Sequence, residues 1–477
     1  MASTGARAGS AKASSSSVSS VPSRPELHSL VGRLLVCAGP RGLPALLSAG
    51  LLILGGARAG AQQAPADPPT EQPGAQPPDV KDESSKTTAP FGLSRWINPA
   101  TAPFIPVPVI GADPNSGTTL GILPTWLQSN DKDEISRIIA PDLIHNPNFG
   151  WGAHGRIFDY PSENEQLSLV GSISQRVQRG IDAEYQTELT RHERWSFNFS
   201  LIFDQDGTQR FYGYGSHSRK GNETDYTKSQ ELFEFQAGLN LTREWQLLFT
   251  VRPQRYEVRA GTLDGLPSIE ERFPDLNGLG STTAVLNRLS LIYDTRDSRS
   301  VPTQGVQAIV YGGLAGRHGV LNDSMYSEAG IDARSFWPLA AYGVLATHVA
   351  LRYLPSEHDV PFWAYSELGG DRDYVGGAQA LRGYGAGRFY GRNSLAGSVE
   401  LRNKLFGFNA AASHVDVEVG PFIDTGDVSS AGLPVRHLHY VTGVGFRGVA
   451  RPFIVGYVDM GYGDEGVAIF TGIDYPF

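Results

Sequence analysis

The sequence is poor in cysteine, in positive charge and in long apolar runs. Its one cysteine, Cys37, lies in an N-terminal stretch that we expect to be removed. The mature chain would then lack thiols, which excludes disulfide scaffolds, paired-cysteine zinc sites and cysteine nucleophiles. The 477 residues include 40 basic and 49 acidic ones, for a formal net charge of −9. Because an acidic chain repels a polyanion, we expect no nucleic-acid partner.

Residues 1–61 have the organisation of a leader followed by a secretory signal. A basic region precedes the mostly apolar run 43–54, and the small residues 59–61 follow it. This order predicts cleavage before Gln62, and the apolar run is too short to anchor the chain as a membrane helix. An organellar transit peptide is the alternative, because the first 25 residues contain serine and arginine but no acid.

The rest of the chain divides into a linker and a long alternating body. Residues 62–100 are rich in Pro, Gln, Asp and Ala, which predicts a flexible, disordered linker. From residue 101 to residue 477 apolar and polar residues alternate, as they do in 195–203 and again in 233–241, before a tight polar turn at 242–244. Alternation with a period of two predicts strands that have one apolar and one polar face.

A soluble β-sandwich also alternates, so other features must separate it from a membrane barrel. The apolar faces are rich in aromatic residues, and tight turns alternate with long polar connections such as 259–281 and 355–373. No segment of the expected mature chain is apolar enough for a transmembrane helix. The fold class predicted is all-β, a transmembrane antiparallel β-barrel in residues 101–477. At about 23 residues per strand and connection it would have about 16 strands, although spacing alone allows 14 or 18.

A glycine-rich segment around residues 376–391 carries a guanidinium at its tip, in Leu381-Arg382-Gly383-Tyr384. Arginine binds a planar carboxylate through two parallel hydrogen bonds. Glu400 and Asp424 are acids at strand-like positions downstream. An ordinary surface loop with a solvated arginine is one alternative, and a paired-carboxylate acid/base site is another. The neighbouring cation favours ion pairing for both acids.

This pattern resembles the outer-membrane barrel-assembly superfamily (BamA/TamA-like proteins, with the bacterial surface antigen domain) over essentially all of residues 101–477. The resemblance implies a loop that folds into the lumen and docks its tip on acids of the inner wall. Leu381, Arg382, Gly383 and Tyr384 would form that tip. The resemblance also implies that Glu400 and Asp424 are its ion-pair partners, and it favours 16 strands.

A second motif of the same superfamily lies at residues 293–305. Asp294, Arg296 and Asp297 precede Pro302 and Gly305. We expect the acids and the arginine to pair at the barrel rim while proline and glycine shape the turn. A calcium loop built on Asp294 and Asp297 is the alternative, but its carboxylates are too few. We therefore expect no metal and no cofactor.

The C-terminal residues fit the closing-strand signal of outer-membrane barrels, which assembly machinery recognises by strand pairing. Gly472, Tyr475 and the terminal Phe477 carry this signal. Pro476 cannot donate a backbone hydrogen bond, so it should mark the end of the last strand.

The resemblance implies a bacterial outer-membrane protein that takes part in protein or lipid assembly or translocation. Its expected partners are outer-membrane lipids, and unfolded outer-membrane proteins or a separate periplasmic partner. Relatives usually carry periplasmic POTRA modules, but the linker 62–100 is too short to hold one, which puts client insertion in doubt. A passive porin-like channel with a charged lumen is the alternative. A hydrolase around residues 215–218 is a third possibility, but adjacent Ser and His point apart, so we expect no enzyme.

Overall fold

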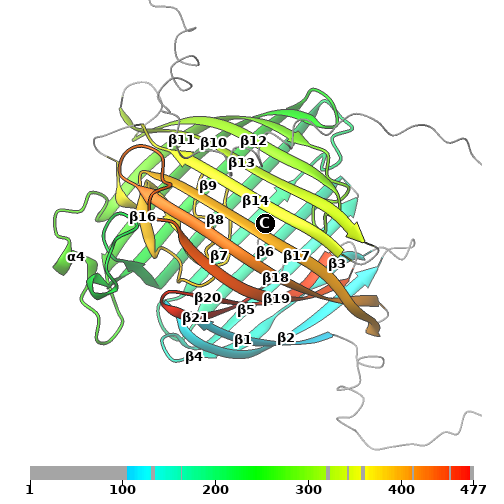
Figure 1. Cartoon of the computed structure of the whole chain (residues 1–477), viewed down its shortest axis with the longest axis horizontal. Coiled ribbons are helices and arrows are strands. Elements are labelled where there is room, and N and C mark those ends of the chain that lie inside the picture. Colours follow the sequence, from blue (N-terminus) through cyan, green and yellow to red (C-terminus); the bar gives the residue numbers. More distant parts are fainter. Residues whose placement is uncertain are drawn as a thin grey trace, which may run out of the picture. The chain divides into compact units, whose positions relative to one another are not determined.

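The computed structural model describes residues 105–129, 135–162, 164–317, 323–340, 343–355, 360–410, 413–450 and 453–472. Most of these residues form one antiparallel sheet of 19 strand segments, which closes on itself where β1 meets β21 (Figure 1). The expected leader 1–61, the linker 62–100, and both Tyr475 and Phe477 of the closing-strand signal lie outside the described residues.

The strands follow one another around the barrel in chain order, and the short helices lie in connections. No helix within the described ranges is long and apolar enough to cross a membrane. The elements are β1 (Ile105–Asp113), β2 (Gly117–Ser129), β3 (Ile135–Ile139), β4 (Asp142–Asn146), β5 (Gly150–Ser162), β6 (Glu165–Ser174), β7 (Arg179–Gln186), β8 (Trp195–Phe211), η2 (Lys220–Asn222), β9 (Thr224–Asn240), β10 (Trp245–Ala260), α4 (Ile269–Arg272), β11 (Gly280–Asp294), β12 (Gly305–Gly316), β13 (Ser324–Ala340), β14 (Gly343–Tyr353), η3 (Phe362–Ala364), β15 (Ser366–Leu368), β16 (Phe389–Gly391), β17 (Asn393–Ala410), β18 (Ser413–Ser429), β19 (His439–Ala450), β20 (Phe453–Gly463) and β21 (Gly466–Gly472).

The number of strands differs from the expected 16. Segments β3 and β4 both pair with β2 on one side and β5 on the other, so they are two halves of one strand. Pro141, which has no backbone N–H, lies at the break between them. The described part of the barrel therefore has 18 strands. The prediction of 16 was wrong because the average strand and connection take about 20 residues rather than about 23.

The two faces of the sheet confirm a membrane barrel. Large apolar side chains point outward and are exposed along β8, where they are Trp195, Phe197, Phe199, Leu201 and Phe203. Charged side chains such as Arg288, Glu328, Asp332 and Arg352 are buried on the inside. Such an inverted distribution would be unfavourable in water, but it suits a closed sheet in a bilayer, whose outer face meets hydrocarbon.

The two ends of the barrel carry different connections. One end, called the far end below, has the long connections 212–223, 261–279 and 354–392. The opposite, near end has the turn 241–244 and the rim connection 295–304. In outer-membrane barrels the long connections face the outside of the cell.

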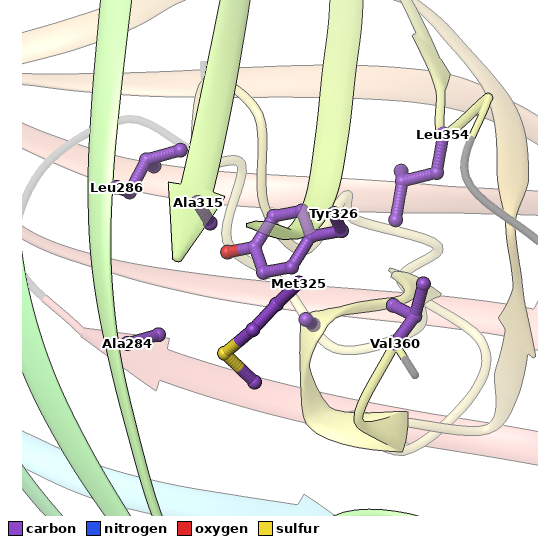
Figure 2. Close-up of a cluster of buried hydrophobic side chains, with 8 residues drawn as sticks. Ala284, Leu286, Ala315, Met325, Tyr326, Leu354 and Val360 are labelled. Carbon is purple, nitrogen blue, oxygen red and sulfur yellow. The ribbon is translucent and has the colours of Figure 1, made fainter. Parts of the chain in front are cut away.

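The longest of these connections lies between β14 and β17 and is called the lumenal loop below, because its described residues 354, 355 and 360–392 fold into the lumen. It contains the two-stranded sheet of β15 and β16. A buried cluster fixes its first residues to the wall, and Figure 2 shows Leu354 and Val360 of this segment together with Met325 and Tyr326 of β13. A register shift between Ala315 and Gly316 lets both of these neighbouring β13 side chains be buried.

Candidate functional site

The tip of the lumenal loop binds the barrel wall through Arg382. Its Nε and Nη2 donate to the two carboxylate oxygens of Asp424, at 2.9 and 2.8 Å, and its Nη1 donates to Glu400 Oε2 at 2.9 Å. The arginine side chain is 1% exposed, and both acids are fully buried. The structure therefore brings together the arginine and both acids that the sequence singles out.

Three further charged residues complete this site and were missed by the sequence reasoning. Arg382 Nη1 lies 3.0 Å from Asp459 Oδ2. Arg447 Nη2 lies 3.1 Å from Glu400 Oε2 and 3.2 Å from Asp459 Oδ1, and Arg402 Nε donates to Glu400 Oε1 at 3.0 Å. The cluster, called the arginine–carboxylate cluster below, has balanced formal charge. Its members are Arg382, Arg402, Arg447, Glu400, Asp424 and Asp459.

The barrel register explains how residues far apart in sequence meet here. The carboxylates come from β17, β18 and β20, and Asp459 lies opposite Gly445, two residues before Arg447 in β19. Strand alternation places each of these side chains on the lumenal face. An alternating pattern can indicate which residues face inward, but the neighbours across strands depend on the register, which the sequence does not show.

Other contacts fix the orientation of the Arg382 fork. The guanidinium carbon lies 3.5 Å from the centre of the Phe422 ring, and Nη2 also donates to Ser398 Oγ at 3.2 Å. Burial alone would lower the pKa of Arg382, but the charges of Asp424 and Asp459 hold it well above its ordinary value. The arginine therefore stays charged, and stacking on an aromatic face adds to its ion pairs.

The neighbours of Arg382 in the tip pack on β19 and β20. Leu381 and Tyr384 are buried in one apolar cluster with Phe422 and Val441. A Cβ on Gly383 would come within 2.8 Å of the Gly463 backbone nitrogen, so only glycine lets the tip approach the wall this closely. Burial raises the pKa of the Tyr384 hydroxyl to about 12.

The rim motif lies where the sequence places it, in the connection between β11 and β12 at the near end. Arg296 Nε and Nη2 bind both oxygens of Asp294, at 3.0 and 2.9 Å. Asp297 Oδ1 accepts hydrogen bonds from the backbone nitrogens of residues 298, 303 and 304. Pro302 is buried, and Gly305 has φ +103°, which favours glycine. Both carboxylates are thus engaged within the turn.

The lumenal loop also contacts both sides of the place where the sheet closes. The β1–β21 closure, called the seam below, registers at one described residue pair, Ala112 with Ile469. At the far end of the seam, Asn115 of the β1–β2 turn donates to the carbonyl oxygen of Ala386 at 2.6 Å. Arg388 donates from Nε to Glu465 of the β20–β21 turn at 2.7 Å. Residues 386–388 therefore bridge the seam.

Ser216, the first of the two serines in residues 215–218, has no catalytic arrangement within the described part of the chain. The Ser216 hydroxyl donates to Asp427 and accepts a hydrogen bond from the Val428 backbone nitrogen at 2.9 Å. The His439 ring lies 3.1 Å from the backbone oxygen of Ser216 rather than from its hydroxyl. No described histidine is positioned as a base for this hydroxyl. The Ser216 hydroxyl instead holds the connection 212–223 against β18.

A closed antiparallel sheet with an apolar exterior and a charged interior defines an integral outer-membrane β-barrel. The family model of the Omp85 superfamily domain matches residues 163–447, so the chain belongs to the Omp85 superfamily. This confirms the resemblance to BamA/TamA-like barrels and the bacterial outer membrane as the location, and it favours this family over a simple porin.

Solved structures similar to this chain include BamA from Haemophilus ducreyi lacking POTRA domains 1–3 and CdiB from Acinetobacter baumannii. Each is 13% identical to this chain, with a TM-score of 0.44, and the match covers 74% of this chain. It covers 75% of the BamA chain and 65% of the CdiB chain. The comparison with curated proteins gave no match.

Proposed function

We propose that this barrel assembles or translocates other outer-membrane polypeptides, and that a client strand enters at the seam. The proposal rests on the small number of residue pairs that join β1 to β21 across the seam. Strand β1 registers with β2 over nine residue pairs and with β21 at one, within the described residues. Because opening a sheet breaks its backbone hydrogen bonds, separation at the seam would disrupt the fewest residue pairs among the described residues.

An opened seam would present two strand edges to the membrane. Unpaired backbone N–H and C=O groups in hydrocarbon are strongly unfavourable, and an unfolded client strand can pair with them. The seam would thus act as a template for strand addition. Membership of the Omp85 superfamily supports this role.

We assign the arginine–carboxylate cluster the role of holding the lumenal loop in the lumen. The bridge made by residues 386–388 depends on this position, since the same loop supplies Arg382. We further propose that a separate periplasmic partner delivers the client, in line with the short linker 62–100, and that the protein is not an enzyme. The bonding of Ser216 to Asp427 supports this last point.

The test measures how fast an unrelated, unfolded outer-membrane barrel inserts into liposomes that contain the purified chain. We expect faster insertion than into empty liposomes, and slower insertion when Arg382→Ala frees the lumenal loop. Equal rates with and without the chain, together with steady ion conductance that Arg382→Ala leaves unchanged, would favour a passive channel and contradict the proposal.

A further inference from the structure

A groove lies on the outer, lipid-facing surface of the barrel, away from the seam and the lumen. It has a volume of about 330 Å³ and is formed by β8, β9, β10 and β11 with the first residue after β12. Its apolar wall consists of Leu201, Phe203 and Phe233, all of which are exposed. The volume is within the range of about 300–1,000 Å³ that is usual for small-ligand sites.

A proline within the sheet explains why a groove forms here. Pro253 lines the groove and has no backbone N–H to donate to β9. The β9–β10 register accordingly runs from the pair Val251–Phe235 directly to Gln254–Leu232, without pairs in between. Prolines are rare in central strands because they remove ladder hydrogen bonds. The interruption lies beside Phe233, and the groove is therefore a property of the sheet itself.

Charged side chains line one part of the groove. Arg255 lies opposite Glu231 in the register, and their side chains are 48% and 57% exposed and 3.9 Å apart. Arg317, the first residue after β12, is exposed at the far end. Charges on the lipid-facing surface are tolerated near the membrane interface and are costly at its middle. These three charged side chains therefore lie at the headgroup level of the leaflet at the far end of the barrel.

The apolar side chains Leu201 and Phe233 lie deeper in the membrane than the charged side chains of the groove. Leu201 and Phe233, which are opposite each other in the register, are two residues nearer the near end than Phe203 and Glu231. The groove thus presents cations beside Phe203 at headgroup level, and the apolar side chains of Leu201 and Phe233 at acyl-chain level. Glu231 and Arg255 form an exposed pair, and such pairs contribute little, so a stronger anion can take the place of the carboxylate.

We propose that this groove binds a phosphorylated, acylated lipid of the outer leaflet, with its phosphate on Arg255 and Arg317 and one acyl chain along Leu201, Phe203 and Phe233. Arginine forms charge-assisted, bidentate hydrogen bonds with phosphate. The far end faces outward, so the lipid belongs to the outer leaflet. Binding would hold β8–β12 at a fixed depth while the seam, which lies elsewhere on the barrel, opens.

The test uses native mass spectrometry of the full chain, transferred into detergent and incubated with lipid A or with dephosphorylated lipid A. We expect lipid A to bind the wild type and the dephosphorylated form to bind roughly fivefold or more weakly, because charge-assisted hydrogen bonds are lost. The double variant Arg255→Gln/Arg317→Gln should lose this preference. Glu231→Gln should strengthen lipid A binding, because it removes the competing carboxylate.

Arg259→Gln is the matched control, since Arg259 is 51% exposed, belongs to the same end of β10 and does not line the groove. It should bind lipid A as the wild type does. Heat-modifiable mobility in a gel verifies that every variant is folded. Equal binding of both lipids, or unchanged binding by the folded double variant, would overturn the proposal. A mass of two copies of the chain without lipid, present for the wild type and lost in the double variant, would also overturn the proposal.

Discussion

Replacing Arg382 with alanine should destabilise the barrel strongly. The substitution removes the ion pairs to Glu400, Asp424 and Asp459, and leaves the cluster with one excess negative charge among buried groups. Asp424 is affected most, because Arg382 binds both of its oxygens and Ser398 is its other side-chain donor. Breaking a buried ion pair by removing one partner costs about 3–5 kcal/mol.

The free energy of unfolding can be followed by urea titration in lipid vesicles, with tryptophan fluorescence as the signal, since the chain has seven tryptophans. Arg382→Lys keeps the charge but not the two-oxygen geometry, so its loss should be smaller. The double variant Arg382→Ala/Asp424→Asn should recover part of the loss, because the unpaired carboxylate is gone. A change of less than about 1 kcal/mol for Arg382→Ala, which is the usual range of a surface pair, would show that the buried ion pairs of Arg382 do not stabilise the barrel.

Three further predictions concern the tip, the rim and the seam. Gly383→Ala should release the tip from β20 and make residues 381–384 accessible to protease, because its Cβ would lie 2.8 Å from the Gly463 nitrogen; unchanged resistance would contradict this. Burial opposes ionisation of Asp297, but hydrogen bonds from Thr303 and its neighbours hold the pKa below the usual 3.8. Ionised Asp297 therefore stabilises the folded barrel above pH 3.8, and this contribution is lost as the pH falls through the lower pKa of Asp297 in the folded state. Asp297→Asn should thus lower the thermal midpoint at pH 7, and the difference from wild type should shrink in acid; a difference independent of pH would count against the assignment. Arg388→Gln removes the bond to Glu465 and should speed hydrogen exchange in the β20–β21 turn, measured against the β8–β9 pair as an internal control.

The sequence predicts the fold class well, because a membrane barrel turns each strand into an alternating pattern. Residues 195–203 show it clearly, and their large apolar side chains are exposed as expected. The tip and two of the acids that bind it, Glu400 and Asp424, were also predictable, since an arginine at a glycine-rich tip favours a carboxylate partner. Asp459 and Arg447 were not, because their contact with the tip depends on the register between β19 and β20.

The strand number shows a different limit of the sequence. A mean spacing cannot detect that short turns make the repeat shorter than assumed. The groove on the outer surface is likewise hidden in the sequence. In the sequence, Pro253 argues against a central strand, because proline lacks the backbone N–H that a strand needs. Only the register shows that β10 continues through Pro253 and leaves a gap in its pairing beside Phe233.

If a client strand enters the barrel at the seam, a reversible covalent lock across the seam should block its entry. Cysteines at Ala112 and Ile469, which are partners across the seam, would be placed in a chain whose single natural cysteine is Cys37. We predict that oxidation to the disulfide stops accelerated insertion of an unfolded barrel into liposomes, and that a reductant restores it. Insertion at the same rate with the seam locked, verified by gel mobility, would show that client strands do not enter at the seam.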